Sequence, residues 1–409
     1  MAVGRAPGSR AFVIGYRESM DVTIVADDLT GACDTGALFA GRGPVSVVIA
    51  PALPEADPEV VTLDTESRAL SENDAASAVR RLSTALASRL ARSAVFKKID
   101  STFRGPVAVE LDALVVGAGA RAALVCPAFP AMGRTVVHGL LSVHGVPVHH
   151  SPIGSDPDYR AATSDLVEML ARRSALPVSL LSLKEMRGPA ADLARAARER
   201  RGLVVVDAET DADLRALVHA AHDHSDLILA GSAGLAHAAS AAWGHAATVP
   251  DLPAAGSCLV VAGSRHPATR GQIAALERAG ITGVRVEQSG GSSTRGAVQR
   301  LREGDATFIA SAEALEGTRE EMAARLAAAA GAVLAEIVPD LLVVTGGDTA
   351  LAVLRALGPR RLELVGAPAR GLALGRLVFD ARAPITVLTK AGGFGAPELL
   401  VSLATGAVR

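Results

Sequence analysis

Short apolar runs alternate with stretches of helical periodicity along most of this sequence, and this alternation restricts the possible folds more than any other feature. We interpret the apolar runs as buried strands; they occupy residues 22–26, 45–50, 60–63, 94–99, 122–126, 203–207, 227–230, 258–262, 284–286, 307–310, 341–345, 362–365 and 385–388. Helical patterns lie between them, including residues 71–90, with Ser71 as the expected N-cap, and the Ala-rich run 320–336. The alternation predicts an α/β fold with largely parallel sheets flanked by helices.

The length of the chain indicates two domains. Its 409 residues exceed what one ordinary hydrophobic core organises. Residues 240–256 are rich in Ala, Pro and other small residues and contain no strand pattern, so we assign them to a linker. The chain is thereby divided into an N-terminal tail at 1–19, a first α/β domain at 20–239 and a second α/β domain at 257–409. Residues 136–150 are punctuated by glycines and are expected to form a hairpin or a long loop.

Charge and cysteine content exclude several classes of function. The 41 basic and 43 acidic residues nearly balance, so no broad electrostatic field favours nucleic acid or an anionic membrane. No apolar run reaches the roughly 18 residues of a membrane span, and residues 1–19 lack the apolar centre of a signal peptide. Cys33, Cys126 and Cys258 are too widely spaced for a disulfide framework or a zinc cluster. Small-molecule chemistry in the cytoplasm is the expectation.

Two acids follow the first strand directly. Asp27 and Asp28 stand after the apolar run 22–26, and residues 29–36 have the pattern of a helix start. In an open α/β sheet, ligands bind outside the carboxyl ends of the parallel strands. Asp27 and Asp28 are therefore candidate catalytic carboxylates.

A second polar junction follows the strand at 94–99. It contains Lys98, Asp100, Ser101, Thr102 and Arg104. Alternate residues share a strand face, so the Lys98 ammonium and the Asp100 carboxylate are expected to lie close together. These groups suit a small polar anion. The alternative is that Asp100 or Ser101 only caps the next helix and that Arg104 makes a surface ion pair.

Lysine is rare in this chain, which contains 37 Arg and only four Lys. Lys97, Lys98 and Lys390 all lie in the junctions described here, where a compact ammonium suits a carboxylate or a phosphoryl oxygen; chance is the alternative in so small a sample. Arg68, after the strand at 60–63, adds a planar guanidinium suited to a carboxylate. It is as readily explained by a surface pair with Glu66 or Glu72.

The second half contains three glycine-bearing loops, each between a strand and a helical pattern. Glycine lets backbone amides approach an anion, and a helix N-terminus favours negative charge, so three such loops in one domain indicate a nucleotide. The candidate nucleotide-binding residues are Ser264, Gly346, Gly347, Asp348, Thr349, Lys390, Gly392 and Gly393. Asp348 either caps its helix, which is the simpler reading, or helps to hold a magnesium ion.

Three other kinds of site are disfavoured. None of the four lysines follows a glycine, so the chain has no Walker-type phosphate loop. It also lacks a strict Gly-x-Gly-x-x-Gly, which argues against a dinucleotide-dependent dehydrogenase. His219, His222 and His224 have a spacing that metal ligands use, but their polar surroundings are typical of a solvated helix end. The metal ligands stay undetermined.

With these stretches assembled, the chain resembles the four-carbon acid sugar kinase family over nearly its whole length. The shared motifs run from Ala-Asp-Asp-Leu-Thr-Gly-Ala at 26–32 to Lys-Ala-Gly-Gly-Phe-Gly at 390–395. Members of this family hold an acid sugar in the N-terminal domain and ATP in the C-terminal domain. They phosphorylate the terminal hydroxyl of threonate, erythronate or an oxo-tetronate. The resemblance implies this fold and activity here, with the active site in the cleft between the domains.

The resemblance also assigns residues to the two sites. The matching sugar-side positions are Asp27, Asp28, Arg68, Lys98, Asp100, Ser101, Thr102 and Arg104. The matching nucleotide-side positions are Ser264, Gly346 to Thr349, Gly392 and Gly393. His266 replaces a hydroxyl residue that relatives commonly carry, which puts one contact to ATP in doubt. Residues 127–130 and 133–135 match another family stretch whose role the sequence does not reveal.

These assignments lead to a mechanistic hypothesis. Lys98, Arg68 and Arg104 would bind the substrate carboxylate, while Asp27 or Asp28 would orient the terminal hydroxyl and accept its proton. The second-half loops would hold the ATP phosphates with Mg²⁺. The rivals are a non-catalytic sensor of an acid sugar and a nucleotide, and an NAD-dependent sugar-acid dehydrogenase. The sequence does not decide the oligomeric state, for which a homodimer is the default expectation.

Overall fold

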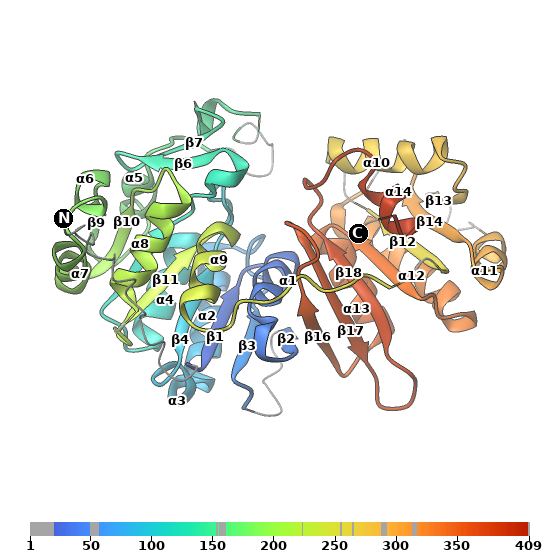
Figure 1. Cartoon of the computed structure of the whole chain (residues 1–409), viewed down its shortest axis with the longest axis horizontal. Coiled ribbons are helices and arrows are strands. Elements are labelled where there is room, and N and C mark those ends of the chain that lie inside the picture. The colour runs from blue at the N-terminus through green and yellow to red at the C-terminus, as the bar shows by residue number, and fades with distance from the viewer. Residues whose placement is uncertain are drawn as a thin grey trace, which may run out of the picture.

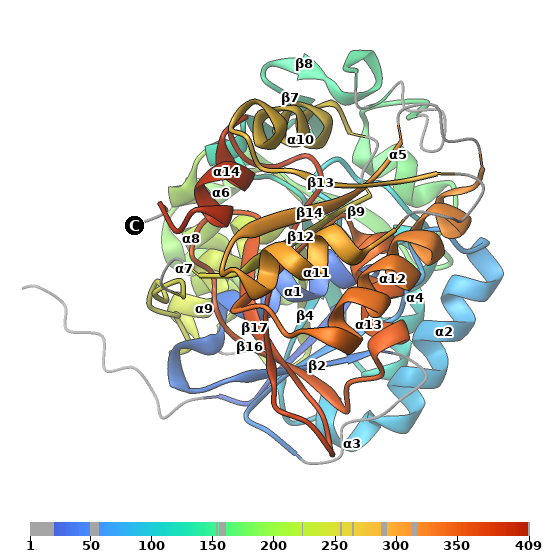
Figure 2. The same ribbon diagram turned by 90° about the vertical axis from the view of Figure 1, so that its right-hand side faces the viewer.

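The computed structural model describes residues 20–49, 57–152, 154, 161–222, 224–253, 256–263, 266–287, 293–312 and 317–407. Within these ranges the chain forms a mixed α/β fold in which helices cover a large, mostly parallel sheet (Figure 1). The predicted fold class is therefore confirmed. In the view turned by 90°, α12 and α13 lie on one side of the second-half strands and α10 and α14 near their upper edge (Figure 2). The described residues contain no helix both long enough and apolar enough to cross a membrane.

The elements of the first half carry the sugar-side candidates. The strands are β1 (Val22–Ala26), β2 (Val45–Ile49), β3 (Val60–Asp64), β4 (Ala94–Lys98), β5 (Ala122–Cys126), β6 (Arg134–Val137), β7 (Leu140–Val143), β8 (Val146–Pro147), β9 (Val178–Leu181), β10 (Gly202–Val206) and β11 (Leu227–Gly231). The helices are α1 (Leu29–Leu38), α2 (Glu72–Ala85), α3 (Ala87–Leu90), α4 (Val107–Gly117), α5 (Leu166–Ala171), α6 (Leu183–Met186), α7 (Ala190–Glu199), α8 (Asp211–Ala221) and α9 (Ala233–Ala242). Short 3₁₀ turns lie at Ala40–Arg42, Pro130–Met132 and Val148–His150.

The elements of the second half carry the glycine loops. The strands are β12 (Cys258–Ala262), β13 (Gly283–Val286), β14 (Ala306–Ser311), β15 (Leu341–Thr345), β16 (Arg361–Gly366), β17 (Leu372–Val378) and β18 (Ile385–Lys390). The helices are α10 (Pro267–Arg278), α11 (Arg295–Arg302), α12 (Arg319–Glu336), α13 (Gly347–Leu357) and α14 (Leu399–Ala404). The predicted helix at 320–336 and the Ser71 cap of α2 are confirmed.

Both halves contribute to one continuous sheet. In the described residues its strand order is β13-β14-β12-β15-β18-β17-β16-β2-β3-β1-β4-β11-β5-β10-β9. The strands from β2 to β9 pair in parallel, as do those from β13 to β18. The joint is antiparallel: Val45 of β2 faces Leu364 of β16. The two expected sheets thus join edge to edge, which protects both edge strands from unwanted pairing.

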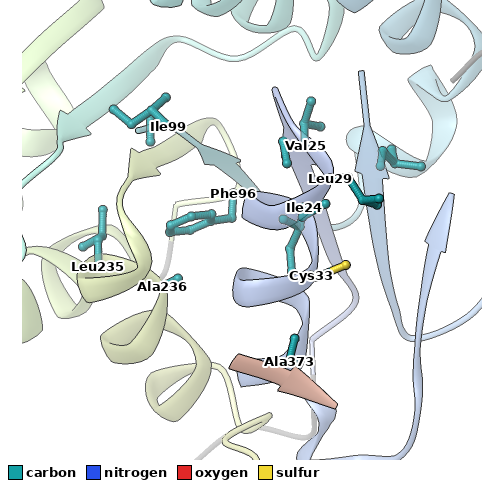
Figure 3. Packing of buried hydrophobic residues seen from close by; sticks show 14 of the residues in the cluster. Ile24, Val25, Leu29, Cys33, Phe96, Ile99, Leu235, Ala236 and Ala373 are labelled. Atoms are coloured by element: carbon teal, nitrogen blue, oxygen red, sulfur yellow. The ribbon is translucent and has the colours of Figure 1, made fainter. Parts of the chain in front are cut away.

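Helix α1 packs between the two halves. Cys33 and Leu29 on this helix lie beside Ile24 and Val25 of β1, with Ala373 of β17 close by (Figure 3). The helix is rich in Gly and Ala, and this allows the close approach. A Cβ atom added at Gly36 would lie 2.6 Å from Thr62 Oγ1 and 2.8 Å from Leu364 Cδ1, one residue from each half. The small side chains of α1 therefore fix the acidic turn at the junction of the halves.

The segment after α9 runs along this junction rather than through open solvent. Its backbone bonds to the end of α1 and the following turn, with Ala247 N 3.1 Å from Leu38 O and Gly41 N 3.1 Å from His245 O. The His245 Nε2 atom lies 2.7 Å from the Met20 carbonyl oxygen.

A small antiparallel sheet stands apart from the main one and confirms the hairpin predicted at 136–150. Strands β6, β7 and β8 form it, and β6 and β7 rise above the carboxyl ends of the first-half strands (Figure 1). Two strands, β9 and β17, were not predicted from the sequence. The first has mostly half-buried residues, and Gly375 and Arg376 interrupt the apolar pattern of the second.

Candidate active site

The acidic turn after β1 is held by one arginine. Arg68 donates from Nε to Asp27 Oδ2 at 2.8 Å and from Nη2 to Asp27 Oδ1 at 2.7 Å, while its Nη1 atom lies 2.8 Å from Asp28 Oδ2. Burial by itself raises the pKa of Asp27, but Arg68, Lys97 and Lys98 outweigh it and lower that pKa below its usual value. Asp27 is therefore ionised, and both its oxygens are bound to Arg68. The surface pairing of Arg68 considered as an alternative is replaced by this buried cluster.

Asp28 is the N-cap of α1. Its Oδ1 accepts from Gly31 N at 2.9 Å, and its Oδ2 accepts from Thr30 Oγ1 at 2.7 Å. A Cβ atom at Gly31 would lie 2.4 Å from Asp28 Oδ1 and 3.3 Å from Lys98 Nζ, so the glycine leaves room for both charged groups. Lys98 thus reaches the acidic turn, and its Nζ atom also donates to the Ile99 carbonyl at 3.1 Å.

Asp100 lies in the turn after β4 and orders that turn. Strand β4 ends at Lys98, so the expected sharing of a strand face does not extend to Asp100. Instead, Asp100 accepts from Thr102 N at 2.8 Å and from Arg104 Nε and Nη2 at 3.0 and 2.7 Å, with Ser101 between them in the turn. Burial opposes ionisation, but Arg104, Arg68 and Thr102 hold the pKa of Asp100 well below its usual range. The predicted alternative of an Asp100 cap is not seen, because Pro106 is the N-cap of α4.

Gly105 brings the two sugar-side clusters together. Its φ of +98° is one that glycine adopts readily. A Cβ atom there would lie 3.4 Å from Arg68 Cγ and 3.4 Å from Asp27 Oδ2. The predicted residues Asp27, Asp28, Arg68, Lys98, Asp100 and Arg104 therefore share one region of the sheet edge.

A buried ion pair between Lys97 and Glu110 stabilises this region. Lys97 Nζ lies 2.9 Å from Glu110 Oε2, and both side chains are fully buried. Ser67 Oγ donates to Glu110 and lies 2.6 Å from Thr65 Oγ1, which in turn donates to the Ala26 carbonyl at 2.8 Å. Lys97 is thus a structural residue that stabilises the turn carrying Arg68. In the sequence, the only indication of this partner is that Glu110 is the one glutamate in the apolar segment that forms α4.

Asp64, at the end of β3, is a buried carboxyl beside a second carboxyl. Its Oδ1 accepts from Glu66 N at 3.0 Å, and Glu66 has a left-handed φ of +49°. Burial and the neighbouring Glu66 raise the pKa of Asp64 well above its usual value. At pH values between the usual aspartate pKa and the raised one, the folded protein therefore holds a proton on Asp64 that the unfolded chain releases.

Replacing Asp64 by Asn tests this arrangement through pH. Because the folded-state pKa is raised, wild-type stability falls as pH rises from 3.8, the usual aspartate value, through the folded pKa. The D64N variant lacks this loss, so it should be more stable than the wild type at pH 7, by a margin that shrinks on acidification. Urea unfolding followed by the fluorescence of Trp243, the single tryptophan, measures the difference. The exposed Asp251→Asn serves as control, and equal pH profiles for D64N and wild type would contradict the assignment.

The three glycine loops of the second half converge. Gly346, with φ +96°, begins α13, and its N–H donates to the Lys390 carbonyl at 3.0 Å. A Cβ atom at Gly263 would lie 2.1 Å from Thr349 Oγ1, so the loop after β12 touches α13. The predicted residue Ser264 lies outside the described residues. Asp348 stands in the first turn of α13 but does not cap it through its side chain.

The last loop is held by side chains of α10 and by a lysine. Thr269 Oγ1 donates to the Gly392 carbonyl at 2.7 Å, and a Cβ atom at Gly393 would lie 3.3 Å from His266 Nε2. Lys390 Nζ donates to the carbonyls of Ala391 and Phe394, at 2.9 Å each. Burial lowers the pKa of Lys390 to about 8. Lys390 thus stabilises the backbone conformation of this loop through its hydrogen bonds to the loop carbonyls.

The acidic turn and a glycine loop meet at the junction of the halves. A Cβ atom at Gly347 would lie 3.4 Å from both Asp28 Oδ2 and Thr30 Oγ1. Asp28 and Asp348, one from each half, both raise the pKa of Glu66, whose largest perturbation is burial. A carboxylate placed after a first-half strand therefore faces the N-terminus of a second-half helix.

Comparison with known proteins gives one family profile for each half of the chain. A family profile described as a sugar-binding N-terminal domain matches residues 22–239, and one described as a nucleotide-binding C-terminal domain matches residues 259–400. The D-threonate kinase of Bordetella bronchiseptica is 34% identical over 94% of this chain and 96% of its own. The chain belongs to the four-carbon acid sugar kinase family.

Other members of this family are similar over the same length. The D-threonate kinase of Salmonella typhimurium is 31% identical, covering 93% of this chain and 97% of its own, and the 3-oxo-tetronate kinase of Methylobacterium radiotolerans is 34% identical with the same coverage. Crystal structures of a Haemophilus influenzae and a Salmonella typhimurium protein share the fold, with TM-scores of 0.72 and 0.75. They are 22% and 21% identical and cover 95% of this chain and 100% and 99% of their own.

Proposed function

We propose that this protein is an ATP-dependent kinase that phosphorylates the terminal hydroxyl of a four-carbon acid sugar. The observation that carries the proposal is the approach of Asp28 to Gly347, which brings a carboxylate of the sugar side to the helix N-terminus of the nucleotide side. A hydroxyl held by Asp28 would face a phosphoryl group held at Gly347. The names of the relatives, which are kinases for threonate, erythronate and 3-oxo-tetronate, support the substrate class.

The two aspartates would play different parts. Asp27 is 1% exposed and has both oxygens on Arg68, whereas the Asp28 side chain is 18% exposed and lies toward Gly347. Asp28 is therefore the better candidate to orient the hydroxyl and accept its proton. Lys98 reaches the same turn and would bind substrate oxygens there. Asp100, Ser101, Thr102 and Arg104 would form the wall on the β4 side. Most of the rate enhancement would come from positioning and charge neutralisation, as is usual for phosphoryl transfer.

The second-half loops would hold ATP. Gly347 and Thr349 in the first turn of α13, together with Gly392 and Gly393, would offer backbone amides to the phosphates, and Ser264 is proposed to join them. Gly346 would hold the start of α13 in place, because its own N–H is bonded to the Lys390 carbonyl. Mg²⁺ usually keeps several waters and binds through substrate phosphates plus one or two carboxylates. The carboxylate of Asp348, in the first turn of α13, fits that requirement, and a bound Mg²⁺ would neutralise phosphate charge.

A direct assay tests the proposal. Purified protein is incubated with ATP, Mg²⁺ and, separately, D-threonate, D-erythronate and a 3-oxo-tetronate, and ADP release is followed. We expect ADP release with at least one acid, and ³¹P and ¹³C spectra of the product should place the phosphate on the terminal carbon. Binding of an acid without turnover would instead favour the sensor. Reduction of NAD would favour the dehydrogenase.

Three further expectations stay predictions. The matched profiles leave residues 240–258 unmatched, which includes the proposed linker at 240–256. We also expect a homodimer and a cytoplasmic location. Light scattering of the purified protein and fractionation of cells would test the last two.

A further inference from the structure

Arg134 is a half-buried cation at the sugar-side edge that the roles above do not use. It is the first residue of β6 and follows the loop that leaves β5. Two backbone hydrogen bonds with Phe129 hold it, from Phe129 N to Arg134 O at 2.8 Å and from Arg134 N to Phe129 O at 3.1 Å. The preceding Gly133 has φ +66°, and a Cβ atom there would lie 2.3 Å from the His144 ring. The position of Arg134 is therefore well fixed.

The same loop is fastened to the main sheet. Ser232 Oγ, at the end of β11, donates to the Ala128 carbonyl at 2.7 Å. A Cβ atom at Gly234 would lie 2.9 Å from Phe129 Cδ2, so α9 and the loop are in close contact. Arg134 is thus carried by the carboxyl ends of β5 and β11, next to β4 in the strand order.

The guanidinium of Arg134 has N–H donors that make no hydrogen bond within the described part of the chain. Its Nε and Nη1 atoms are shielded from solvent, and neither has a hydrogen-bond partner among the described residues. Arg68 and Arg104 differ, because each binds an aspartate through two nitrogens. Shielded N–H donors without an acceptor are unfavourable, so the two on the half-buried Arg134 suggest an anion that the protein itself does not supply.

The charges around Arg134 locate it beside the β4 cluster. Burial lowers the pKa of Arg134, Asp100 acts in the opposite direction, and Arg104 lowers it further. Arg134 therefore shares its surroundings with the residues proposed to form the wall of the acid-sugar site. It is also far along the strand order from β16, where the nucleotide-binding half begins.

We propose that Arg134 binds the carboxylate of the acid substrate through its guanidinium, with Arg104 alongside. This inference rests on the proposed kinase function. Asp28 and Gly347 define the hydroxyl end of the site, so a carboxylate at Arg134 sets the direction in which the substrate lies. A planar guanidinium binds a carboxylate with two parallel hydrogen bonds, which an ammonium does not reproduce.

Steady-state kinetics of the full-length Arg134→Gln variant test this inference. The KM for the preferred acid should rise at least about 30-fold, because a hydrogen-bonded charge pair that uses shielded nitrogens is lost, while the KM for ATP stays unchanged. The wild type should prefer the acid over its primary amide, and R134Q should lose that preference. The Arg134→Lys variant should recover part of it. Arg121→Gln, at the opposite end of β5, where Arg121 pairs with Asp226, is the matched control.

The outcomes separate the two proposals. If the wild type phosphorylates none of the acids, the kinase function and the role of Arg134 fall together. If the wild type is active and R134Q keeps the wild-type KM and acid preference, only the role of Arg134 is overturned. Trp243 fluorescence checks folding, and if the Gln variant does not fold, the acid-to-amide preference of R134K decides: an unchanged preference overturns the role, and a reduced one supports it.

Discussion

The Asp28→Asn variant is expected to lose at least about 10³-fold in kcat while still binding ATP, because the group that orients the hydroxyl and accepts its proton becomes neutral. Asn is a good N-cap, and its side-chain oxygen can still accept from Gly31 N, so α1 should stay intact. Asn has nearly the same shape as Asp, so the packing of this side chain near Gly347 should not change. The measurements are kcat with the preferred acid and the Kd for ATP by calorimetry.

A matched control separates the loss of charge from the loss of a cap. Asp165 is the N-cap of α5, where it accepts from Glu168 N at 3.0 Å. The Asp165→Asn variant makes the same chemical change at a helix start that is not part of the proposed site, and it should keep wild-type kcat. A D28N enzyme with unaltered kcat would remove Asp28 from the mechanism and return the role to Asp27.

The Lys97→Met variant is expected to lose about 3–5 kcal/mol of unfolding free energy, because it leaves Glu110 as an uncompensated buried charge. Lys97 and Glu110 are both fully buried, and Ser67 also bonds to Glu110. Without Lys97, the turn that carries Arg68 should loosen, so the KM for the acid should rise as well. Urea unfolding monitored by Trp243 gives the free energy.

A double variant and a surface variant sharpen this test. In Lys97→Met with Glu110→Met, neither charge is buried, so most of the lost stability should return. The Arg195→Met change breaks the exposed pair of Arg195 with Asp192 and should cost less than about 0.5 kcal/mol. A loss below about 1 kcal/mol for Lys97→Met would show that the buried pair does not stabilise the fold as argued.

Much of the architecture was predictable because it depends on local patterns. The apolar runs predicted β1, β5, β12 and β15 closely, since a buried parallel strand is a short apolar segment in any context. The Ala-rich composition predicted α12, and glycines marked the loops. The same reading missed β9 and β17, because half-buried or glycine-containing strands do not show that pattern.

The functional groups were harder to assign, because their partners are distant in sequence. The sequence identified Asp27, Arg68 and Asp100 as candidates, but it offered Glu66 or Glu72 as partners for Arg68. The structure shows Arg68 bound to Asp27, 41 residues away. Lys97 was grouped with possible ligand-binding lysines, yet it is a structural residue paired with Glu110. Arg134 stood in a motif without a role, because only the structure shows that two of its nitrogens are shielded from solvent and have no partner among the described residues.

The sequence by itself determined the α/β class, the order of the strands along the chain and the glycine loops, because these follow from periodicity and backbone preference within a few residues. The tertiary structure alone decided that β2 and β16 join the two sheets and that Asp28 lies against Gly347. Edge pairing and contact across the junction arise from how α1, with its small side chains, packs between strands of both halves. No local pattern encodes that packing, since it depends on surfaces that form only when both halves have folded.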